Sequence, residues 1–389
     1  MQILYVTHHF TPDIVAGALR AYKHTTELAK LNHKINVITS NSGNFLSDST
    51  FNIPNACSVT RVSGFHIPYL PAGYGYVRNF VNAGLKYANE IDTILATAPT
   101  ISAVIAGYKI SKKINKPLVS EIRDPWLRGS NSAKLEKGGS HISINSLQGK
   151  LFKNIQRKIL TYSKKIIVTN NEIITEITKI HPEITLDKFV VVYNAAELDT
   201  IKSIRAEKFA VPTIFCSGVL YRERGIDLLI KALALTNNIQ LVFAGFAPEQ
   251  DMRYYEKLIY DLDLRDRVHF LGIISPGKSI ALQKSADILF VGQSDPKLNY
   301  QLPARTLEYM AVGKPILALA IKNSGLDNLI TLHNCGQVVY SHNPSDLAAA
   351  IKHLQNKKFA VLLGRAGKSA VVRELNLKTQ IKKLEAALS

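Results

Sequence analysis

The sequence predicts an α/β protein with two doubly wound domains of similar size, each built on a parallel sheet. Its 389 residues are too many for one ordinary core and fit two domains. An apolar strand at residues 2–7, a helix around residues 18–29 and a strand at residues 35–39 form a strand–helix–strand unit, which implies parallel pairing. The same order restarts with a strand at residues 213–218, a helix from Gly225 to Leu233 and a strand at residues 241–245.

Composition limits the class of protein. Hydrophobic residues make up 46% and charged residues 20% of the chain, as in globular proteins. Cys57, Cys216 and Cys335 are far apart, which argues against a disulfide framework or a zinc site and favours a reducing cytosol. The chain begins directly with an apolar strand, and no stretch approaches the roughly 20 apolar residues that cross a bilayer. We therefore expect a cytoplasmic protein.

Positive charge is concentrated in the first part of the chain, which carries a formal net charge of +18 overall. Residues 1–165 contain 21 Lys and Arg against 8 Asp and Glu, and residues 138–171 contain no acidic residue. A basic face fits anionic lipid head groups, nucleic acid or phosphorylated substrates, and the alternative is a merely basic surface. No zinc-finger spacing or RNA-binding aromatic motif is present, so we expect no nucleic-acid partner.

Two places in the first domain carry glycine or polar residues after a predicted strand. The loop that ends at Gly17 lacks the Gly-x-Gly-x-x-Gly of dinucleotide-binding folds, which weighs against a dehydrogenase. The strand at residues 117–122 runs into Arg123, Asp124 and Trp126. Open α/β folds bind ligands at this edge of the sheet. The alternatives are a plain helix-entry glycine, and a structural ion pair beside a packed tryptophan.

The loop between the strand at residues 213–218 and the helix from Gly225 carries Arg222 and Arg224. Arginines on a strand-to-helix loop suit a diphosphate, because the guanidinium stays charged and binds phosphate bidentately. The alternative for each is a solvated surface charge.

Residues 302–318 predict a short helix followed at once by a buried strand. Pro303 suits the first helical turn, Gly313 suits the left-handed residue that ends a helix, and Leu307 should be core. Glu308 lies off the apolar face, one turn after Arg305, and can reach over the positive end of its own helix. That end attracts phosphate, and a carboxylate beside it suits the hydroxyls of a ribose. The alternative is an exposed glutamate paired with Arg305.

This segment resembles the donor-site signature of the retaining glycosyltransferases of family 4, in which two glutamates separated by seven residues precede a Gly-Lys-Pro run. Glu308 matches the second glutamate, whose family role is to hold the ribose of a nucleotide sugar. Tyr300 stands at the position of the first glutamate, which is the usual contact to the sugar in this family. Gly17 matches the second glycine of a Gly-Gly pair near the donor, with Ala16 at the first. Arg123 stands where other branches of the family have a sugar-contacting or catalytic histidine, with Asp124 beside it.

The resemblance is strongest at residues 213–233, 268–291 and 302–318. It implies that Arg224 is the second of two cations that bind the diphosphate, that Val219 occupies the place of the first, and that Arg222 compensates. It further implies a donor site that includes Gly218, Gly245, Ile274, Arg305 and Thr306. Backbone groups near Ile274 would contact the base.

The fold implied by the resemblance is GT-B. It comprises an acceptor-side domain at residues 1–195, joined by a crossing helix at residues 371–389, and a donor domain at residues 196–370, which face a cleft. The implied activity transfers a hexose or N-acetylhexosamine from a nucleotide-diphosphate sugar, with UDP-sugar favoured, and retains the anomeric configuration. Fixed cations and a helix N-terminus would stabilise the leaving diphosphate.

The acceptor implied by the resemblance and by the basic first domain is a glycan or a lipid-diphosphate-linked sugar, in cell-surface polysaccharide biosynthesis at the inner face of the membrane. No cofactor and no metal ion are expected. Two alternatives stay open. One is a nucleotide-sugar 2-epimerase, which shares this fold, and the other is a non-catalytic partner subunit that binds a nucleotide sugar.

Overall fold

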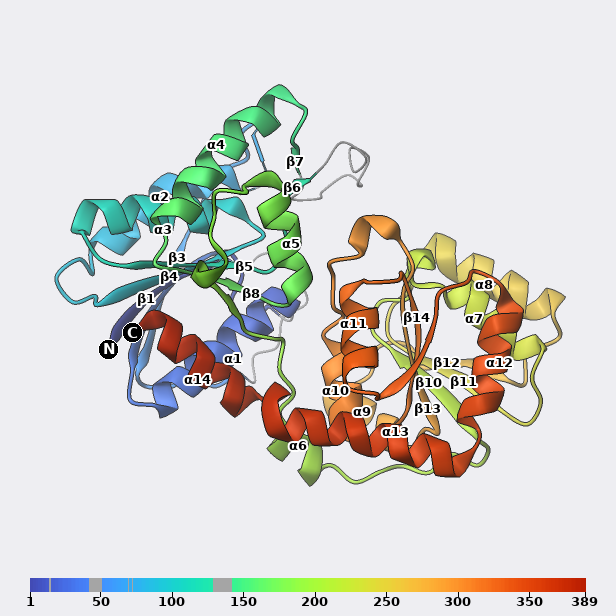
Figure 1. Ribbon diagram of the computed structural model, residues 1–389. Helices are drawn as coiled ribbons and strands as arrows, with labels where there is room; N and C mark the ends of the chain where they lie inside the picture. The colour runs from blue at the N-terminus through green and yellow to red at the C-terminus, as the bar shows by residue number, and fades with distance from the viewer. Residues whose placement is uncertain (14, 42–50, 69, 72, 129–141) are drawn as a thin grey trace. The chain divides into compact units, whose positions relative to one another are not determined.

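The structure, a computed structural model, describes residues 1–13, 15–41, 51–68, 70–71, 73–128 and 142–389. It contains two compact units. Unit 1 comprises Met1–Tyr193 and Lys378–Ser389, and unit 2 comprises Asn194–Leu377. Each unit has one main sheet, entirely parallel, with helices packed on it (Figure 1). The predicted α/β class with two doubly wound sheets is confirmed.

The sheet of unit 1 has seven strands in the order β3-β2-β1-β4-β5-β8-β9. Its central strands are buried on both faces, as expected for a parallel sheet covered by helices. The strand order reverses between β1 and β4, so the carboxyl ends of these strands form the switch point of the sheet. The strands are β1 (Gln2–Val6), β2 (Lys34–Ser40), β3 (Cys57–Val62), β4 (Thr93–Ala98), β5 (Leu118–Ile122), β8 (Lys165–Val168) and β9 (Phe189–Val191).

Helices and short elements complete unit 1. A two-stranded ladder joins β6 (Leu127–Arg128) and β7 (Ile142–Ser143), and 3-10 turns occur at η1 (Tyr74–Tyr76) and η3 (Leu186–Lys188). The helices are α1 (Ala16–Lys30), α2 (Val77–Leu85), α3 (Ile101–Ile114), α4 (Leu147–Tyr162), α5 (Asn171–Ile180) and α14 (Leu377–Leu388).

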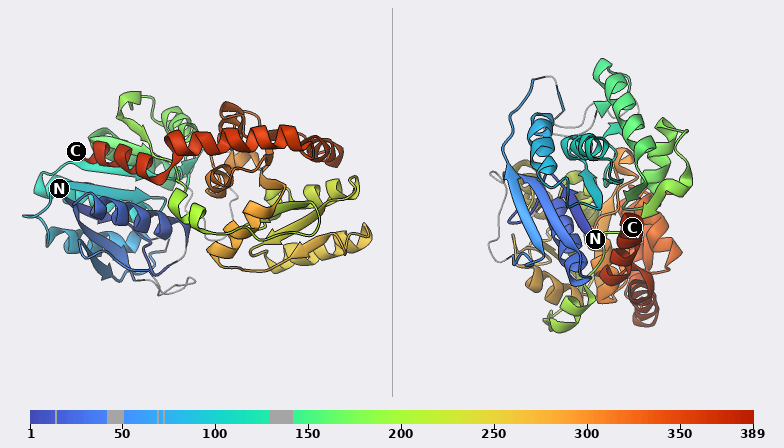
Figure 2. Two further views of the ribbon diagram at one scale, coloured as in Figure 1. Left: turned by 90° about the horizontal axis from the view of Figure 1, so that it is seen from below. Right: turned by 90° about the vertical axis from the view of Figure 1, so that its left-hand side faces the viewer.

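The last helix, α14, packs on unit 1 although it is separated in sequence from the rest of that unit by unit 2. Ile381 and Leu384 are buried, and the Gln380 Oε1 accepts a hydrogen bond of 2.9 Å from the Tyr193 backbone amide. His33 Nε2 lies 2.7 Å from Glu385 Oε1. The two termini consequently lie beside each other (Figures 1 and 2). The helix is not continuous from residue 371, because a π-helical turn at Val371–Leu375 ends before it.

A buried ion pair that the sequence analysis did not identify connects α1 to the sheet of unit 1. Arg20 donates from Nε to Glu121 Oε1 over 2.9 Å, and from its Nη atoms to the carbonyl oxygens of Val192 and Tyr193. Burial acts to raise the pKa of Glu121, but Arg20 and then His24 and Arg123 outweigh it and hold the pKa at about 2. The carboxylate therefore stays ionised inside the core.

Unit 2 has a six-stranded sheet in the order β12-β11-β10-β13-β14-β15, with its switch point between β10 and β13. The strands are β10 (Thr213–Ser217), β11 (Gln240–Ala244), β12 (Val268–Phe270), β13 (Ile288–Gln293), β14 (Ile316–Ala320) and β15 (Gly336–Val339). The helices are α6 (Leu198–Ser203), α7 (Ile226–Ala234), α8 (Glu249–Asp261), α9 (Pro276–Ser285), α10 (Arg305–Val312), α11 (Gly325–Leu332), α12 (Pro344–Leu354) and α13 (Lys357–Ala370), with 3-10 turns η4 (Arg222–Arg224) and η5 (Pro296–Leu298).

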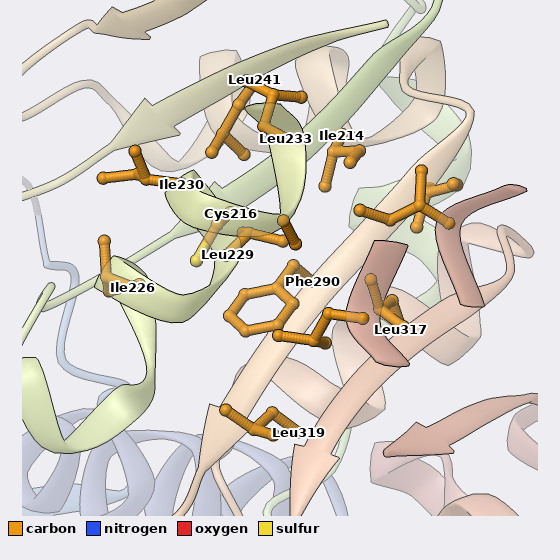
Figure 3. Packing of buried hydrophobic residues seen from close by; sticks show 14 of the residues in the cluster. Ile214, Cys216, Ile226, Leu229, Ile230, Leu233, Leu241, Phe290, Leu317 and Leu319 are labelled. Carbon is orange, nitrogen blue, oxygen red and sulfur yellow. The ribbon is translucent and has the colours of Figure 1, made fainter. Parts of the chain in front are cut away.

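One hydrophobic cluster of unit 2 lies between α7 and one face of this sheet, and helices α8 and α12 also contribute to it (Figure 3). Apolar residues at helical spacing on α7 pack against alternating residues of β10 and β13. Side chains on one face of a helix recur every three or four residues, and those on one face of a strand recur every two. The residues labelled in the figure are Ile214, Cys216, Ile226, Leu229, Ile230, Leu233, Leu241, Phe290, Leu317 and Leu319, all fully buried.

The predicted helix and strand of residues 302–318 are present as α10 and β14. Leu307 is fully buried, as predicted, and Gly313 ends α10 with a left-handed φ of 83°. The helix starts at Arg305, two residues later than predicted. The Thr306 amide donates to the Pro303 carbonyl over 2.9 Å, so Pro303 belongs to the turn that leads into the helix.

Candidate functional site

The carboxyl ends of β10 and β11 approach each other closely, and glycines make this possible. Gly218 follows β10 with φ of 105°, and Gly245 follows β11 with φ of 142°. A Cβ on Gly245 would overlap the carbonyl oxygen of Gly218. The Gly218 amide donates to the Ala244 carbonyl over 2.8 Å. Both predicted glycines thus lie together at the carboxyl edge of the sheet, the edge at which open α/β folds bind ligands.

Arg305, the first residue of α10, lies against this backbone. Its Nη1 donates to the Ser217 carbonyl, and it lies 2.8 Å from the position that a Cβ on Gly218 would take. The Arg305 Nε and the Thr306 Oγ1 are buried and have no hydrogen-bond partner among the described residues. Two polar groups without partners at a helix N-terminus fit an anion, because the helix end itself attracts negative charge.

Arg224 joins the same group from the 3-10 turn η4. Burial, followed by the nearby Arg305 guanidinium, lowers the pKa of Arg224 to about 10. Gly292 of β13 lets the turn approach, since a Cβ there would overlap the Arg224 carbonyl oxygen. Among the described residues, no carboxylate forms an ion pair with Arg224 or Arg305. The adjacent Glu223 acts to raise the pKa of Arg224, but it is the smallest of the causes. Two neighbouring like charges with no ion pair of their own are the electrostatic arrangement that an anionic ligand would relieve.

Arg222, although only two residues away, has different partners. Its Nε lies 3.5 Å from Asp251 of α8, and its guanidinium lies 4.2 Å from the ring centroid of Tyr254. Both contacts are on α8, whereas Arg224 lies near Arg305. The structure therefore separates the two arginines that the sequence analysis grouped.

Glu308 lies in the first turn of α10 and is held by a glutamine from α9. The Gln283 Nε2 donates to Glu308 Oε1 over 2.5 Å and also to Ser279 Oγ. Tyr300, at the position of the expected first glutamate, is buried, and its hydroxyl lies 3.3 Å from Gln301 Nε2. Gln283 was missed by the sequence analysis, since nothing in α9 marks it as a neighbour of Glu308.

Two further residues complete the edge of unit 2. Tyr309 is fully buried, and its hydroxyl accepts a hydrogen bond of 2.9 Å from the Ser217 amide, which ties α10 to the end of β10. Ile274 is half-buried in the segment that follows β12. The Gly245 amide donates to the Gly272 carbonyl over 2.7 Å, so the segments after β11 and β12 are connected.

In unit 1, Gly17 and Arg123 lie together. The Arg123 Nη1 lies 2.5 Å from the position that a Cβ on Gly17 would take, and its Nε donates to the Ala98 carbonyl over 2.8 Å. Gly17, which the structure places in the first turn of α1 and not in the preceding loop, thus meets the residue that follows β5. Asp124 follows Arg123 and is half-buried, and Trp126 is buried.

Two histidines after β1 were missed by the sequence analysis. His8 packs edge-on against Tyr76, and burial lowers the pKa of its imidazole to about 4. His9 lies 3.9 Å from the buried Asp13, and burial and Arg123 lower its pKa. Both imidazoles are therefore neutral at pH 7. The pair of histidines directly after a strand was the signal available in the sequence.

No group of three or more His, Cys, Asp or Glu residues arranged to hold a metal ion occurs in the described part of the chain. Nor is any helix among those residues both long enough and apolar enough to cross a bilayer.

Comparison with known proteins finds a family model that matches part of the chain. Residues 199–370 match the family model of the Glycosyl transferases group 1. An uncharacterized glycosyltransferase of Methanocaldococcus jannaschii is 24% identical over 369 residues, which cover 90% of this chain and 87% of that protein.

Solved structures share the fold of the whole chain. A sucrose-phosphate synthase from Thermosynechococcus elongatus superimposes with a TM-score of 0.74 at 18% identity, covering 99% of this chain and 98% of its own. Anabaena HepE in complex with UDP superimposes with a TM-score of 0.73 at 16% identity, covering 100% of this chain and 99% of the HepE chain. Residues 199–370 are therefore a Glycosyl transferases group 1 domain, in a chain that has the GT-B fold.

Proposed function

We propose that the protein is a glycosyltransferase that moves a hexose or N-acetylhexosamine from a nucleotide-diphosphate sugar to a glycan or lipid-linked acceptor, with retention and without a metal ion. The observation that carries the proposal is the pair of guanidinium groups, Arg224 and Arg305, at the switch-point edge of unit 2 without a carboxylate partner among the described residues. A diphosphate leaving group supplies the negative charge that this pair lacks.

The chemistry follows from where charge develops. As the glycosidic bond breaks, the departing diphosphate gains negative charge, and fixed guanidinium groups stabilise that charge without reorganising. The unpartnered Thr306 Oγ1 and Arg305 Nε supply hydrogen-bond donors beside them. Glu308, oriented by Gln283, would accept hydrogen bonds from the ribose hydroxyls. UDP is the favoured nucleotide, because the similar HepE fold has been solved with UDP and with UDP-glucose.

In unit 1, we propose that Arg123 and Gly17 face the transferred sugar, with Asp124 beside them. Arg222 is the weaker candidate for the diphosphate, since Asp251 and Tyr254 already occupy its guanidinium.

Donor binding and turnover test the proposal separately. A UDP-sugar that is a substrate should raise the melting temperature of the protein, and Glu308→Ala should lose most of that shift. Glu249→Ala, which removes a surface carboxylate paired with Arg253, is the matched control and should keep it. A shift that is undiminished in Glu308→Ala would contradict the ribose assignment.

Product analysis separates the transferase from its alternatives. A transferase forms glycosylated product only with an acceptor and slowly releases free sugar without one. A 2-epimerase of this fold would form an epimeric sugar without any acceptor, and a non-catalytic partner subunit would release no sugar.

We further propose that the acceptor is presented at the inner face of a membrane. Helix α4 exposes Lys153, Arg157 and Lys158, together with Leu147 and Leu151. Cations beside exposed leucines fit an anionic lipid surface. Changing the three cations to glutamate should abolish binding to anionic liposomes, whereas the same change at the exposed Lys352, Lys357 and Lys358 of unit 2 should not. Unchanged binding in the first variant would refute the membrane proposal.

A further inference from the structure

Unit 1 contains a pocket of about 640 Å³, lined by residues of the segment after β3, the turn η1, and helices α2 and α3. This volume is within the roughly 300–1,000 Å³ typical of small-molecule sites. One wall is apolar, formed by Phe65, Ile67, Tyr74, Val77 and Val81. We call this cavity the α2–α3 pocket.

Two cations belong to the same pocket. Arg78 of α2 and Lys109 of α3 line it, both side chains are exposed, and none of the described lining residues is acidic. An apolar wall with cations beside it matches a ligand that has a hydrocarbon part and an anionic part. Asn79 and Asn82 also line the pocket, and their amides can bind the polar part of such a ligand.

The 3-10 turn η1, which contributes Tyr74 and Gly75 to the α2–α3 pocket, also contacts the segment after β1. Tyr76, in the same 3-10 turn as the lining residue Tyr74, packs edge-on against His8, with ring centroids 4.8 Å apart. His8 follows β1, whose end forms the switch point near Gly17 and Arg123. The turn that lines the pocket is thus a neighbour of the segment after β1.

The pocket also adjoins the basic helix. The ring of Tyr74 packs edge-on against Phe152 of α4, with centroids 5.9 Å apart. The neighbouring turns of α4 carry the exposed Leu151 and Lys153. A lipid that leaves an anionic membrane next to α4 would therefore find the pocket beside it.

We propose that the α2–α3 pocket binds the hydrocarbon chain of a lipid-diphosphate-linked acceptor, and that Arg78 and Lys109 hold its phosphate groups. The identity of this lipid as the acceptor rests on the proposed function. The evidence for the pocket itself is the set of residues that line it and their charge.

Direct titration of the full chain tests this inference. Farnesyl diphosphate is the probe, and saturating UDP is present so that a diphosphate site in unit 2 is not sampled. Farnesyl diphosphate should bind at least tenfold more tightly than inorganic pyrophosphate. Arg78→Glu combined with Lys109→Glu should weaken its binding at least tenfold. Lys113→Glu, the same charge change on the exposed face of α3 outside the pocket, should bind as the wild type does.

Two substitutions test the apolar wall. Val81→Asn places an uncharged polar amide on it, and Phe65→Ala removes a side chain that is already 66% exposed, so the second should fold even where the first does not. Each should weaken farnesyl diphosphate binding and leave pyrophosphate binding unchanged. Melting temperatures identify any variant that has not folded.

Equal affinity for pyrophosphate and farnesyl diphosphate, or wild-type affinity in the pocket variants, would overturn the inference. Displacement of the probe by phosphatidylglycerol vesicles would also overturn it, because bulk membrane lipid would then be the occupant. UDP titrations separate this inference from the proposed function. Farnesyl diphosphate binding without UDP binding refutes the transferase and keeps the pocket, and the reverse result refutes only the pocket.

Discussion

Each unit holds arginines at the carboxyl edge of its sheet, and the two sets differ in their counter-ions. In unit 1, Arg20 is buried against Glu121, which is fully buried and ionised. In unit 2, Arg224 and Arg305 lie near each other, and no described carboxylate is paired with either. The first arrangement is complete within the protein. The second has no ion pair among the described residues, and this difference separates an arginine that holds the fold together from arginines available to a ligand.

The largest effect is expected at the buried pair of unit 1. Arg20→Met or Glu121→Leu should each lower the free energy of unfolding by about 3–5 kcal/mol, because each leaves an uncompensated buried charge. The double variant should recover much of the loss. Denaturant titrations measure these values, and Glu176→Ala, which breaks an exposed pair with Lys179, should cost no more than about 1 kcal/mol. If Glu121→Leu costs no more than that control, the buried pair is not what stabilises unit 1.

A pH dependence follows from the same carboxylate. The pKa of Glu121 is about 2 in the folded protein, against an ordinary value of 4.5. A carboxyl group whose pKa falls on folding binds fewer protons in the folded protein than in the unfolded chain. Its contribution to the free energy of unfolding is therefore complete above about pH 4.5 and is lost as the pH falls towards 2. The stability difference between wild type and Glu121→Gln should thus shrink by up to about 3 kcal/mol over that range. A difference that does not depend on pH would show that Glu121 titrates normally.

The smallest effect on stability, of opposite sign, is expected in unit 2. Arg224→Met removes one of two like charges, so without ligand it should leave the unfolding free energy unchanged or raise it by up to about 1 kcal/mol. The same variant should lose donor affinity. Arg222→Met should behave differently. It removes the contacts with Asp251 and Tyr254, and it should retain donor affinity. A large loss of stability in Arg224→Met would place Arg224 with Arg20 as a structural residue.

Local patterns predicted much of the fold. The strand–helix–strand order implied parallel sheets, and Gly313 marked the end of α10 because only a residue tolerant of positive φ fits there. The start of the same helix was misplaced, since Pro303 fits a turn as well as a first helical residue.

Long-range partners could not be predicted in this way. Arg20 and Glu121 are 101 residues apart, and no local pattern connects them. Arg224 was expected to bind the diphosphate with Arg222 compensating for Val219, and the partners of Arg222, Asp251 and Tyr254, could not be foreseen because they lie on the next helix. Arg305 was considered as a partner of Glu308, whereas its guanidinium donates to the Ser217 carbonyl, and Glu308 accepts from Gln283. Such contacts depend on tertiary packing and not on helical spacing.

Calorimetric titration with UDP and with uridine tests the central claim most directly, since the two ligands differ only in the diphosphate. We expect UDP to bind the wild type at least tenfold more tightly than uridine, and this preference to disappear in the Arg224→Met, Arg305→Met double variant. Hydrogen bonds to charged groups contribute about 1.5–3 kcal/mol each, which is enough to account for such a ratio. A preference for UDP that persists undiminished in the double variant would contradict the claim that these two arginines bind the diphosphate.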